Sequence, residues 1–249
     1  MSATGRLVIL SGPSCVGKSP LDRALGRFYP ELRNRLRKLV LFNSRAPRPG
    51  EMDGVDYHFR QQSQIEALRG ESDYAVLDVR GDLQALDVKG LRSMLGQSDA
   101  FFEGNPFVGR ALQTHPQLAE VERLSMFLSP LSRDEISFLQ ATERNVSLPD
   151  FVTDVMRRKL LRRTRRQKGE LSAKDLENIE TRALSAYREL QQAWHFQYVI
   201  PNHDGEDNDH WEAFYYPIGD ARKSLEALAS LLRGVVPAYV EHWEEGLVP

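Results

Sequence analysis

A glycine-rich turn near the N-terminus constrains the fold more than any other part of this 249-residue sequence. Residues 12–19 read G-P-S-C-V-G-K-S and fit the pattern G-x-x-x-x-G-K-S/T at every fixed position. An apolar run at 7–10 precedes them, and apolar residues at helical spacing follow from 18 to 29. This order predicts a buried strand, a phosphate-binding loop and a helix, as in a parallel α/β sheet.

The residue types of this loop suit a polyphosphate. Glycines allow a tight turn in which backbone N–H groups point at phosphate oxygens, and the next helix adds the positive end of its dipole. Lys18 can reach the β- and γ-phosphates, and the Ser19 hydroxyl can bind Mg²⁺. Pro20 fits the first helical turn, where amide groups lack helical partners. The predicted ATP–Mg²⁺ site is Gly12, Pro13, Ser14, Cys15, Val16, Gly17, Lys18 and Ser19.

Apolar runs alternate with helical patterns along the rest of the chain. Strands are predicted at 38–42, 74–79, 100–102, 124–128 and 198–200, and helices over 181–194 and 220–233. This alternation predicts an α/β sheet with helices on its faces. Three segments look added to that core, namely a Pro/Arg-rich turn at 45–57, a basic cluster at 157–166 and an acidic, aromatic segment at 203–219.

Composition narrows the classes of partner. The formal net charge of −2 argues against a protein held on nucleic acid by bulk charge. No apolar stretch is long enough to span a bilayer, and residues 1–6 lack the pattern of a signal peptide. Cys15 is the single cysteine, which excludes an internal disulfide and suits a reducing cytosol. We therefore expect a cytoplasmic protein without membrane or nucleic-acid partners, and the oligomeric state stays open.

A second motif indicates the class of reaction. Residues 44–59 read S-R-A-P-R-P-G-E-M-D-G-V-D-Y-H-F and resemble the guanylate-kinase segment T-R-x-P-R-x-G-E-x-x-G-x-D-Y-x-F. In that family the two arginines and the tyrosine hold the phosphate of the acceptor nucleotide. The resemblance implies the same role for Arg45, Arg48 and Tyr57. Two forked guanidinium groups and a phenol also suit a dianion chemically.

The resemblance continues in order through most of the chain. Blocks at 79–85, 101–105, 127–132 and 198–202 are similar to the family segments V-x-G-N-x-Y-G, L-L-D-I-D, I-F-I-x-P-P-S and D-Y-V-V-x-N. By position, Asn202 would lie near the adenine, and Gln84 and Glu103 would contact the acceptor. The family arginines that embrace the transferring phosphoryl group correspond to Arg158, Arg162 and Arg182.

The positions that read guanine in the family differ here. A serine, a glutamate and a threonine of the family correspond to Leu41, Ala75 and Leu86. A buried guanine edge needs matched donors and acceptors, because unpaired polar groups are costly. These replacements are expected to weaken guanine binding.

Some carboxylates remain near the predicted acceptor site. The acidic strand end keeps Glu103, with Asn105 in place of the family's second aspartate. Glu103 is a candidate for the acceptor base edge or, through water, for the metal. An alternative carboxylate, Asp78 or Asp82, could restore guanine recognition.

The resemblance implies a P-loop kinase fold, in which helices flank a parallel sheet, with a small acceptor-binding sub-domain and a mobile lid. The core would comprise 1–40, 98–155 and 183–235, the acceptor-binding region 41–97, the lid 156–182 and a tail 236–249. The implied activity is transfer of the ATP γ-phosphate to a nucleoside monophosphate, GMP first, with Mg²⁺. Two alternatives stay open, a kinase of another phosphorylated small molecule and a non-catalytic binding module. The intact phosphate loop argues against the second.

Overall fold

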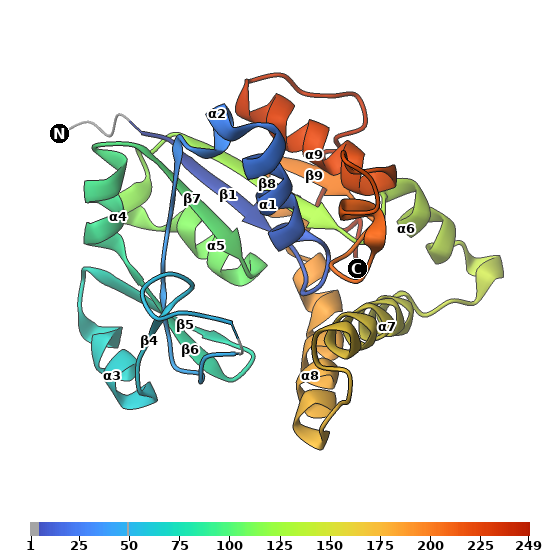
Figure 1. Ribbon diagram of the computed structural model, residues 1–249, viewed down its shortest axis with the longest axis horizontal. Coiled ribbons are helices and arrows are strands. Elements are labelled where there is room, and N and C mark those ends of the chain that lie inside the picture. The colour runs from blue at the N-terminus through green and yellow to red at the C-terminus, as the bar shows by residue number, and fades with distance from the viewer. Residues whose placement is uncertain (1–4, 49) are drawn as a thin grey trace.

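The computed structural model describes residues 5–48 and 50–249. Residues 1–4 of the predicted core and Pro49 of the predicted acceptor loop lie outside the described residues. Figure 1 shows a central sheet with helices on both faces, and a smaller sheet and a helical pair on one side of it.

Five parallel strands form the central sheet. In spatial order they are β2 (Leu36–Lys38), β7 (Asp99–Gly104), β1 (Leu7–Ser11), β8 (Arg123–Ser129) and β9 (Tyr198–Pro201). Strand β1 is therefore central, and all five of its residues are buried. In the register of β1 and β7, Ser11 pairs with Gly104 and Leu10 with Glu103. The phosphate loop consequently begins beside the acidic end of β7.

Helices cover both faces of this sheet. They are α1 (Lys18–Phe28), α2 (Pro30–Arg33), α4 (Val88–Leu95), α5 (Pro106–Thr114), α8 (Ala173–Leu190) and α9 (Gly219–Leu232). Side chains of a strand alternate between faces, so Leu7 and Ile9 pack with α4, α5 and α8, whereas Val8 and Leu10 pack with α1 and α9. Because apolar side chains pack on both faces of β1, the strand has a fixed direction, and so does the start of the loop that follows it.

A second, mixed sheet lies apart from the first. Its strands, in spatial order, are β4 (His58–Phe59), β3 (Phe42–Asn43), β6 (Asp82–Asp87) and β5 (Tyr74–Val79). Helix α3 (Gln62–Glu66) and a 3₁₀ turn at Ala67–Gly70 cover it, and Ile65, Leu83 and Ala85 form its small core. The segment 44–57 connects β3 to β4.

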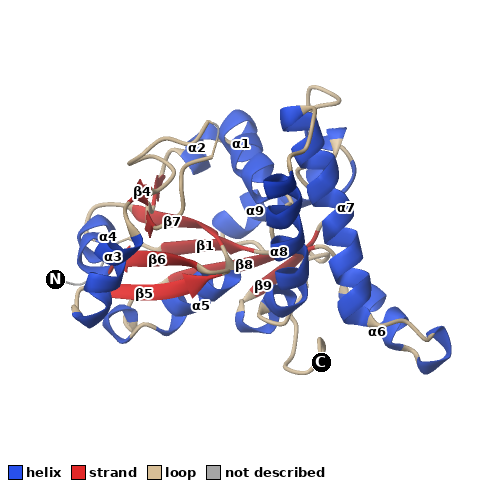
Figure 2. Ribbon diagram, turned by 90° about the horizontal axis from the view of Figure 1, so that it is seen from below, coloured by secondary structure: helices blue, strands red, loops and turns tan. Residues whose placement is uncertain are grey.

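A helical pair extends from the other end of the central sheet. Helix α6 (Arg133–Gln140) leads to α7 (Leu148–Lys168), which packs against α8. Figures 1 and 2 both place α7 away from the small sheet, across the end of the central sheet. Short 3₁₀ turns occur at Pro116–Leu118, Thr142–Arg144, Ala193–His195 and Asp209–Trp211.

Most of the predicted elements are confirmed, with three corrections. The strand predicted at 38–42 is wrong, because β2 ends at Lys38 and β3 begins at Phe42. Between them Leu39 and Leu41 are buried where the chain passes from one sheet to the other, so the apolar run serves two sheets. Strands β4 and β6 were not predicted. The helix predicted over 181–194 starts at Ala173, behind a capping box of Ser172 and Asp175, and ends at Leu190.

The segment after 235 packs back on the core. Glu241 pairs with Val199 of β9, and the side chains of Val240 and Trp243 are buried. Within 5–48 and 50–249, none of the helices has the length and apolar character needed to cross a membrane.

Candidate active site

The loop between β1 and α1 is held in shape from behind. Gly17 has a φ of 108°, and a Cβ built there would lie 2.6 Å from Asn202 Nδ2 and 3.0 Å from the Trp211 ring. Both the backbone conformation and the space therefore require glycine. Asn202 is fully buried, and its Nδ2 donates to the carbonyl of Val16 at 2.7 Å. The segment after β9 thus supports the loop.

Lys18 lies under this loop. Its side chain is buried, and Nζ donates to the carbonyls of Gly12 at 2.8 Å and Pro13 at 2.7 Å. Burial lowers the pKa of Lys18, and the nearby carboxylates of Glu206 and Glu103 oppose that shift. An ammonium held this way, without a carboxylate bonded to it, is available to an anionic ligand.

Ser19 and Glu103 form the next contact along the loop. The Ser19 hydroxyl donates to Glu103 Oε1 at 2.7 Å. Burial raises the pKa of Glu103, while the bond from Ser19 and the charge of Lys18 oppose the shift. No group of three or more His, Cys, Asp or Glu able to hold a metal occurs in the described part of the chain. A hydroxyl and a carboxylate beside a phosphate site nevertheless fit Mg²⁺, which takes few protein ligands and keeps water and phosphate oxygens.

The Pro/Arg-rich turn is organised around Glu51. Arg45 makes a two-pronged bond to its carboxylate, with both N–O distances at 2.6 Å, and lies 5.2 Å from the centre of the Tyr57 ring. The backbone N–H of Arg48 donates to the same carboxylate at 2.8 Å. Burial raises the pKa of Tyr57, so its hydroxyl stays protonated and can donate. Three donors are thereby positioned in one turn.

The phosphate loop and this turn line the same cavity, of about 300 Å³. Helix α8 contributes Arg182, whose guanidinium is buried, and burial lowers its pKa. The predicted site residues that line the cavity are Gly12, Ser14, Cys15, Lys18, Ser19, Arg45, Arg48, Tyr57, Gln84, Glu103 and Arg182.

Other predicted site residues lie outside this lining. Pro13, Val16 and Gly17 belong to the loop and are buried, and Asn202 holds the loop from behind. Arg158 bonds to the carbonyl of Asp154 on its own helix. Arg162 is largely exposed, with Nη1 3.7 Å from Asp207. The structure does not bring these two arginines to the cavity, and their roles stay predictions.

Arg163 lines the cavity and was not singled out from the sequence. It lies on α7 next to the buried residues Leu160 and Thr164. Its Nη1 donates to Glu206 at 2.8 Å. Helical periodicity around the apolar positions 152, 156 and 160 would have favoured 163 over 158 and 162.

The part of the cavity near the small sheet is partly apolar. Leu39, Leu41 and Val79 line it, whereas Ala75 and Leu86 pack in the core instead. Of the two alternative carboxylates, Asp82 lines the cavity. Asp78 does not, and it accepts from the backbone N–H of Gly81 at 2.9 Å.

Comparison with known proteins identifies relatives of this chain. A family model described as guanylate kinase matches residues 4–75. A guanylate kinase of Synechococcus sp. is 30% identical over 215 residues, which cover 86% of this chain and 83% of the relative. The chain belongs to the guanylate kinase family. A crystal structure of guanylate kinase from Anaplasma phagocytophilum has the same fold, with a TM-score of 0.55 and 17% identity over 93% of this chain and 86% of that one.

Similarity within the guanylate kinase family is concentrated near the N-terminus. A guanylate kinase of Mycobacterium tuberculosis is 49% identical over 67 residues, and the match spans only 30% of that relative's length. The part of the chain that the family model matches, residues 4–75, includes the phosphate loop and the Pro/Arg-rich turn.

In this guanylate kinase family member the small sheet is tied to the core by Arg80. This residue lies in the β5–β6 turn with a φ of 60°, and its Nε donates to Glu189 Oε1 of α8 at 2.7 Å. Glu189 is fully buried and also accepts from Asn105 at 3.0 Å and Ser185 at 2.6 Å. The strained turn and the buried ion pair hold the two sheets in one arrangement.

We expect Arg80→Ala to lower the free energy of unfolding by about 3 kcal/mol, because it leaves a buried carboxylate without its cation. The midpoint of urea unfolding measures this. Arg69→Ala removes a surface pair with the exposed Glu66 and should leave the midpoint unchanged. Equal midpoints for the parent, Arg80→Ala and Arg69→Ala would mean that the fold tolerates the buried Glu189 carboxylate without Arg80.

Proposed function

We propose that this chain transfers the γ-phosphate of ATP to the phosphate of a nucleoside monophosphate, with GMP as the first candidate acceptor. One observation carries the proposal, namely that the loop holding Lys18 and the turn holding Arg45 line one cavity. Two sites for anions that share a cavity suit transfer of a phosphoryl group between them. Membership of the guanylate kinase family supports the same reaction.

The residues divide into a donor and an acceptor set. Lys18 and the loop amides hold the β- and γ-phosphates of the donor. Arg45, Arg48 and Tyr57 hold the acceptor phosphate, whose attacking oxygen is already ionised and needs no general base. Arg182 neutralises charge on the transferring group. Arg163, which also lines the cavity, joins it in this role.

Ser19 and Glu103 are the residues that would hold Mg²⁺ with the donor phosphates. The ion, when bound, neutralises part of the charge that builds up on the phosphates.

We further propose that residues 41–97 bind the acceptor and that 156–182 form a lid over the donor. Arg158 and Arg162 would act from that lid on closure. Closing over both substrates excludes water, which would otherwise hydrolyse ATP. A core of 1–40, 98–155 and 183–235 would carry the phosphate loop.

A second candidate is a kinase of another phosphorylated small molecule. The apolar Leu39, Leu41 and Val79 beside the phosphate-binding turn favour it, because guanine requires polar partners. Asp82 supplies one carboxylate there, and burial raises its pKa while Arg45 opposes the shift. A binding module without activity is disfavoured by the complete phosphate loop.

A coupled assay of ADP release over a panel of nucleoside monophosphates and sugar phosphates tests the proposal. We expect release with one nucleoside monophosphate well above the rate with water alone. Release with GMP alone would identify this acceptor, and release with a sugar phosphate alone would establish the second candidate. Silence across the panel would contradict the enzyme and support the binding module.

A further inference from the structure

The segment between β9 and α9, residues 202–218, lies against the phosphate loop. The backbone N–H of Glu206 donates to the carbonyl of Cys15 at 3.3 Å, and Asn202 donates to the carbonyl of Val16. Trp211 is buried against Gly17 and donates to the carbonyls of Asp204 and Gly205 at 2.8 and 3.1 Å. The segment covers the loop at close range.

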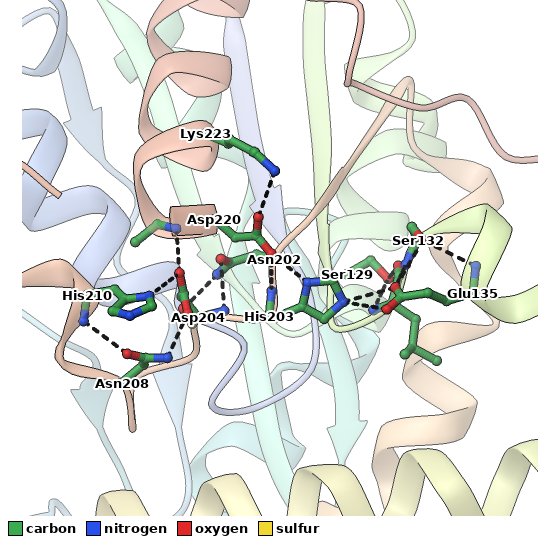
Figure 3. A network of polar contacts seen from close by, with 12 residues as sticks. Ser129, Ser132, Glu135, Asn202, His203, Asp204, Asn208, His210, Asp220 and Lys223 are labelled. Carbon is green, nitrogen blue, oxygen red and sulfur yellow. Dashed lines mark hydrogen bonds and ion pairs between the residues drawn. The ribbon is translucent and has the colours of Figure 1, made fainter. Parts of the chain in front are cut away.

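Polar contacts anchor this segment at its base, as Figure 3 shows. Asp204 accepts from Asn208, from the backbone of Ala221 and, at 2.9 Å, from the His210 ring. His203 lies between two carboxylates, with Nδ1 2.5 Å from Asp220 and Nε2 2.8 Å from Glu135. The base of the segment is therefore fixed to α6 and α9.

Beyond this base the segment faces α7 with a row of opposite charges. Glu206 pairs with Arg163 at 2.8 Å, and Asp209 pairs with Arg166 at 2.8 Å. Asp207 is buried, 3.8 Å from the Nζ of Lys159 and 3.7 Å from Arg162. The four basic residues follow one face of the helix at spacings of three and four. The basic cluster and the acidic segment seen in the sequence are thus partners within the chain.

Glu206, unlike Asp207 and Asp209, lines the cavity that contains the phosphate loop. Among the charges that oppose burial at Lys18 and at Arg182, its carboxylate is the strongest. Burial alone would raise the pKa of Glu206, but Arg163, Lys18 and Arg182 lower it below its usual value. Glu206 thus pairs with Arg163 and shares the cavity with Lys18 and Arg182, the three cations that bind phosphate in the proposed reaction.

We propose that Glu206 is an internal substitute for the donor's terminal phosphates, one that holds α7 over the phosphate loop and must be displaced when the donor binds. The inference rests on the proposed function. A carboxylate and a triphosphate cannot share these cations, because like charges at short distance in a partly buried site repel strongly. Glu206 therefore lowers donor affinity and makes donor binding coincide with movement of the part of the 202–218 segment that carries it.

The test compares binding of a non-hydrolysable ATP analogue with Mg²⁺ to the full chain and to Glu206→Gln by calorimetry. We expect the variant to bind about tenfold more tightly, since the competing charge is gone while the side-chain shape remains. Glu206→Asp keeps the charge and should stay near the parent. Asp209→Asn removes an ion pair to α7 outside the cavity lining and should change the affinity little. Equal or weaker binding by Glu206→Gln would overturn the inference.

A second readout follows the segment itself. Displacement of Glu206 should expose Trp211, so that analogue binding shifts its fluorescence to longer wavelength. The shift should be absent in Trp211→Phe, which leaves the signals of Trp194 and Trp243. Binding without any Trp211-dependent change would contradict displacement.

Binding of magnesium tripolyphosphate distinguishes a failure of this inference from a failure of the proposed function. If the ATP analogue binds neither protein, the donor assignment of the proposed function fails. Tripolyphosphate still probes the same cations, and tighter binding by Glu206→Gln would then support the inference alone. If the parent and Glu206→Gln bind tripolyphosphate equally well, the inference about Glu206 is rejected, whatever the result with the ATP analogue.

Discussion

Lys18→Ala is expected to lower the rate of phosphoryl transfer by about 10³-fold or more, because in the proposed reaction the loop lysine is the cation that would bridge the donor's terminal phosphates. The substitution should leave the fold intact. Among the residues that the structure describes, Lys18 Nζ bonds only to the carbonyls of Gly12 and Pro13, and burial already disfavours its charged form. Turnover in the ADP-release assay and the circular-dichroism spectrum measure the two effects.

The matched control is Lys89→Ala, which removes an exposed lysine on α4. Its turnover should equal that of the parent. Unchanged turnover in Lys18→Ala would remove the ATP site from this loop.

Arg45→Ala is expected to raise the KM for the acceptor by about 100-fold, while the KM for ATP changes little. In the proposed reaction Arg45 would donate N–H bonds to the acceptor phosphate. Its loss also removes the cation that binds both oxygens of Glu51 at 2.6 Å, so that the remaining negative charge of Glu51 repels the acceptor. Initial rates at varied acceptor and at varied ATP separate the two constants.

Arg60→Ala is the control for this second variant. Arg60 follows β4, pairs with the exposed Asp53 and does not line the cavity. It should leave both constants near the parent's values. An effect of Arg45→Ala on ATP alone would show that the turn serves the donor.

The sequence predicts those parts of the site that depend on local chemistry. The phosphate loop follows from fixed glycines between a fully apolar strand and a helix, and the structure has that strand at Leu7–Ser11 and that helix at Lys18–Phe28. The guanylate-kinase resemblance placed Arg45, Arg48 and Tyr57 in one turn, and they line the cavity with Lys18.

What the sequence could not predict depends on contacts between distant segments. The apolar run at 38–42 reads as one strand because burial alone does not reveal that Leu39 and Leu41 lie between two sheets. The pairing of Glu206 with Arg163 joins residues 43 positions apart, and no local pattern encodes it.

The departures from the family concern the acceptor more than the donor. Gln84 and Leu41 line the cavity, and the resemblance aligns them with a tyrosine and a serine of the family. The arginines of the Pro/Arg-rich turn are unaffected by these changes. The residues proposed to bind the acceptor phosphate match the family pattern, whereas those expected near the base differ. The panel assay is therefore needed to establish the acceptor.

The most direct test of the account is the bond that forms in that assay. Transfer between two facing phosphate sites joins the γ-phosphate of ATP to the phosphate of the acceptor, so ³¹P NMR of the products should show ADP together with a new phosphoanhydride in equal amount. Free phosphate alone, or a phosphate ester on an acceptor hydroxyl, would contradict the claim that Lys18 and Arg45 serve the two ends of one transfer.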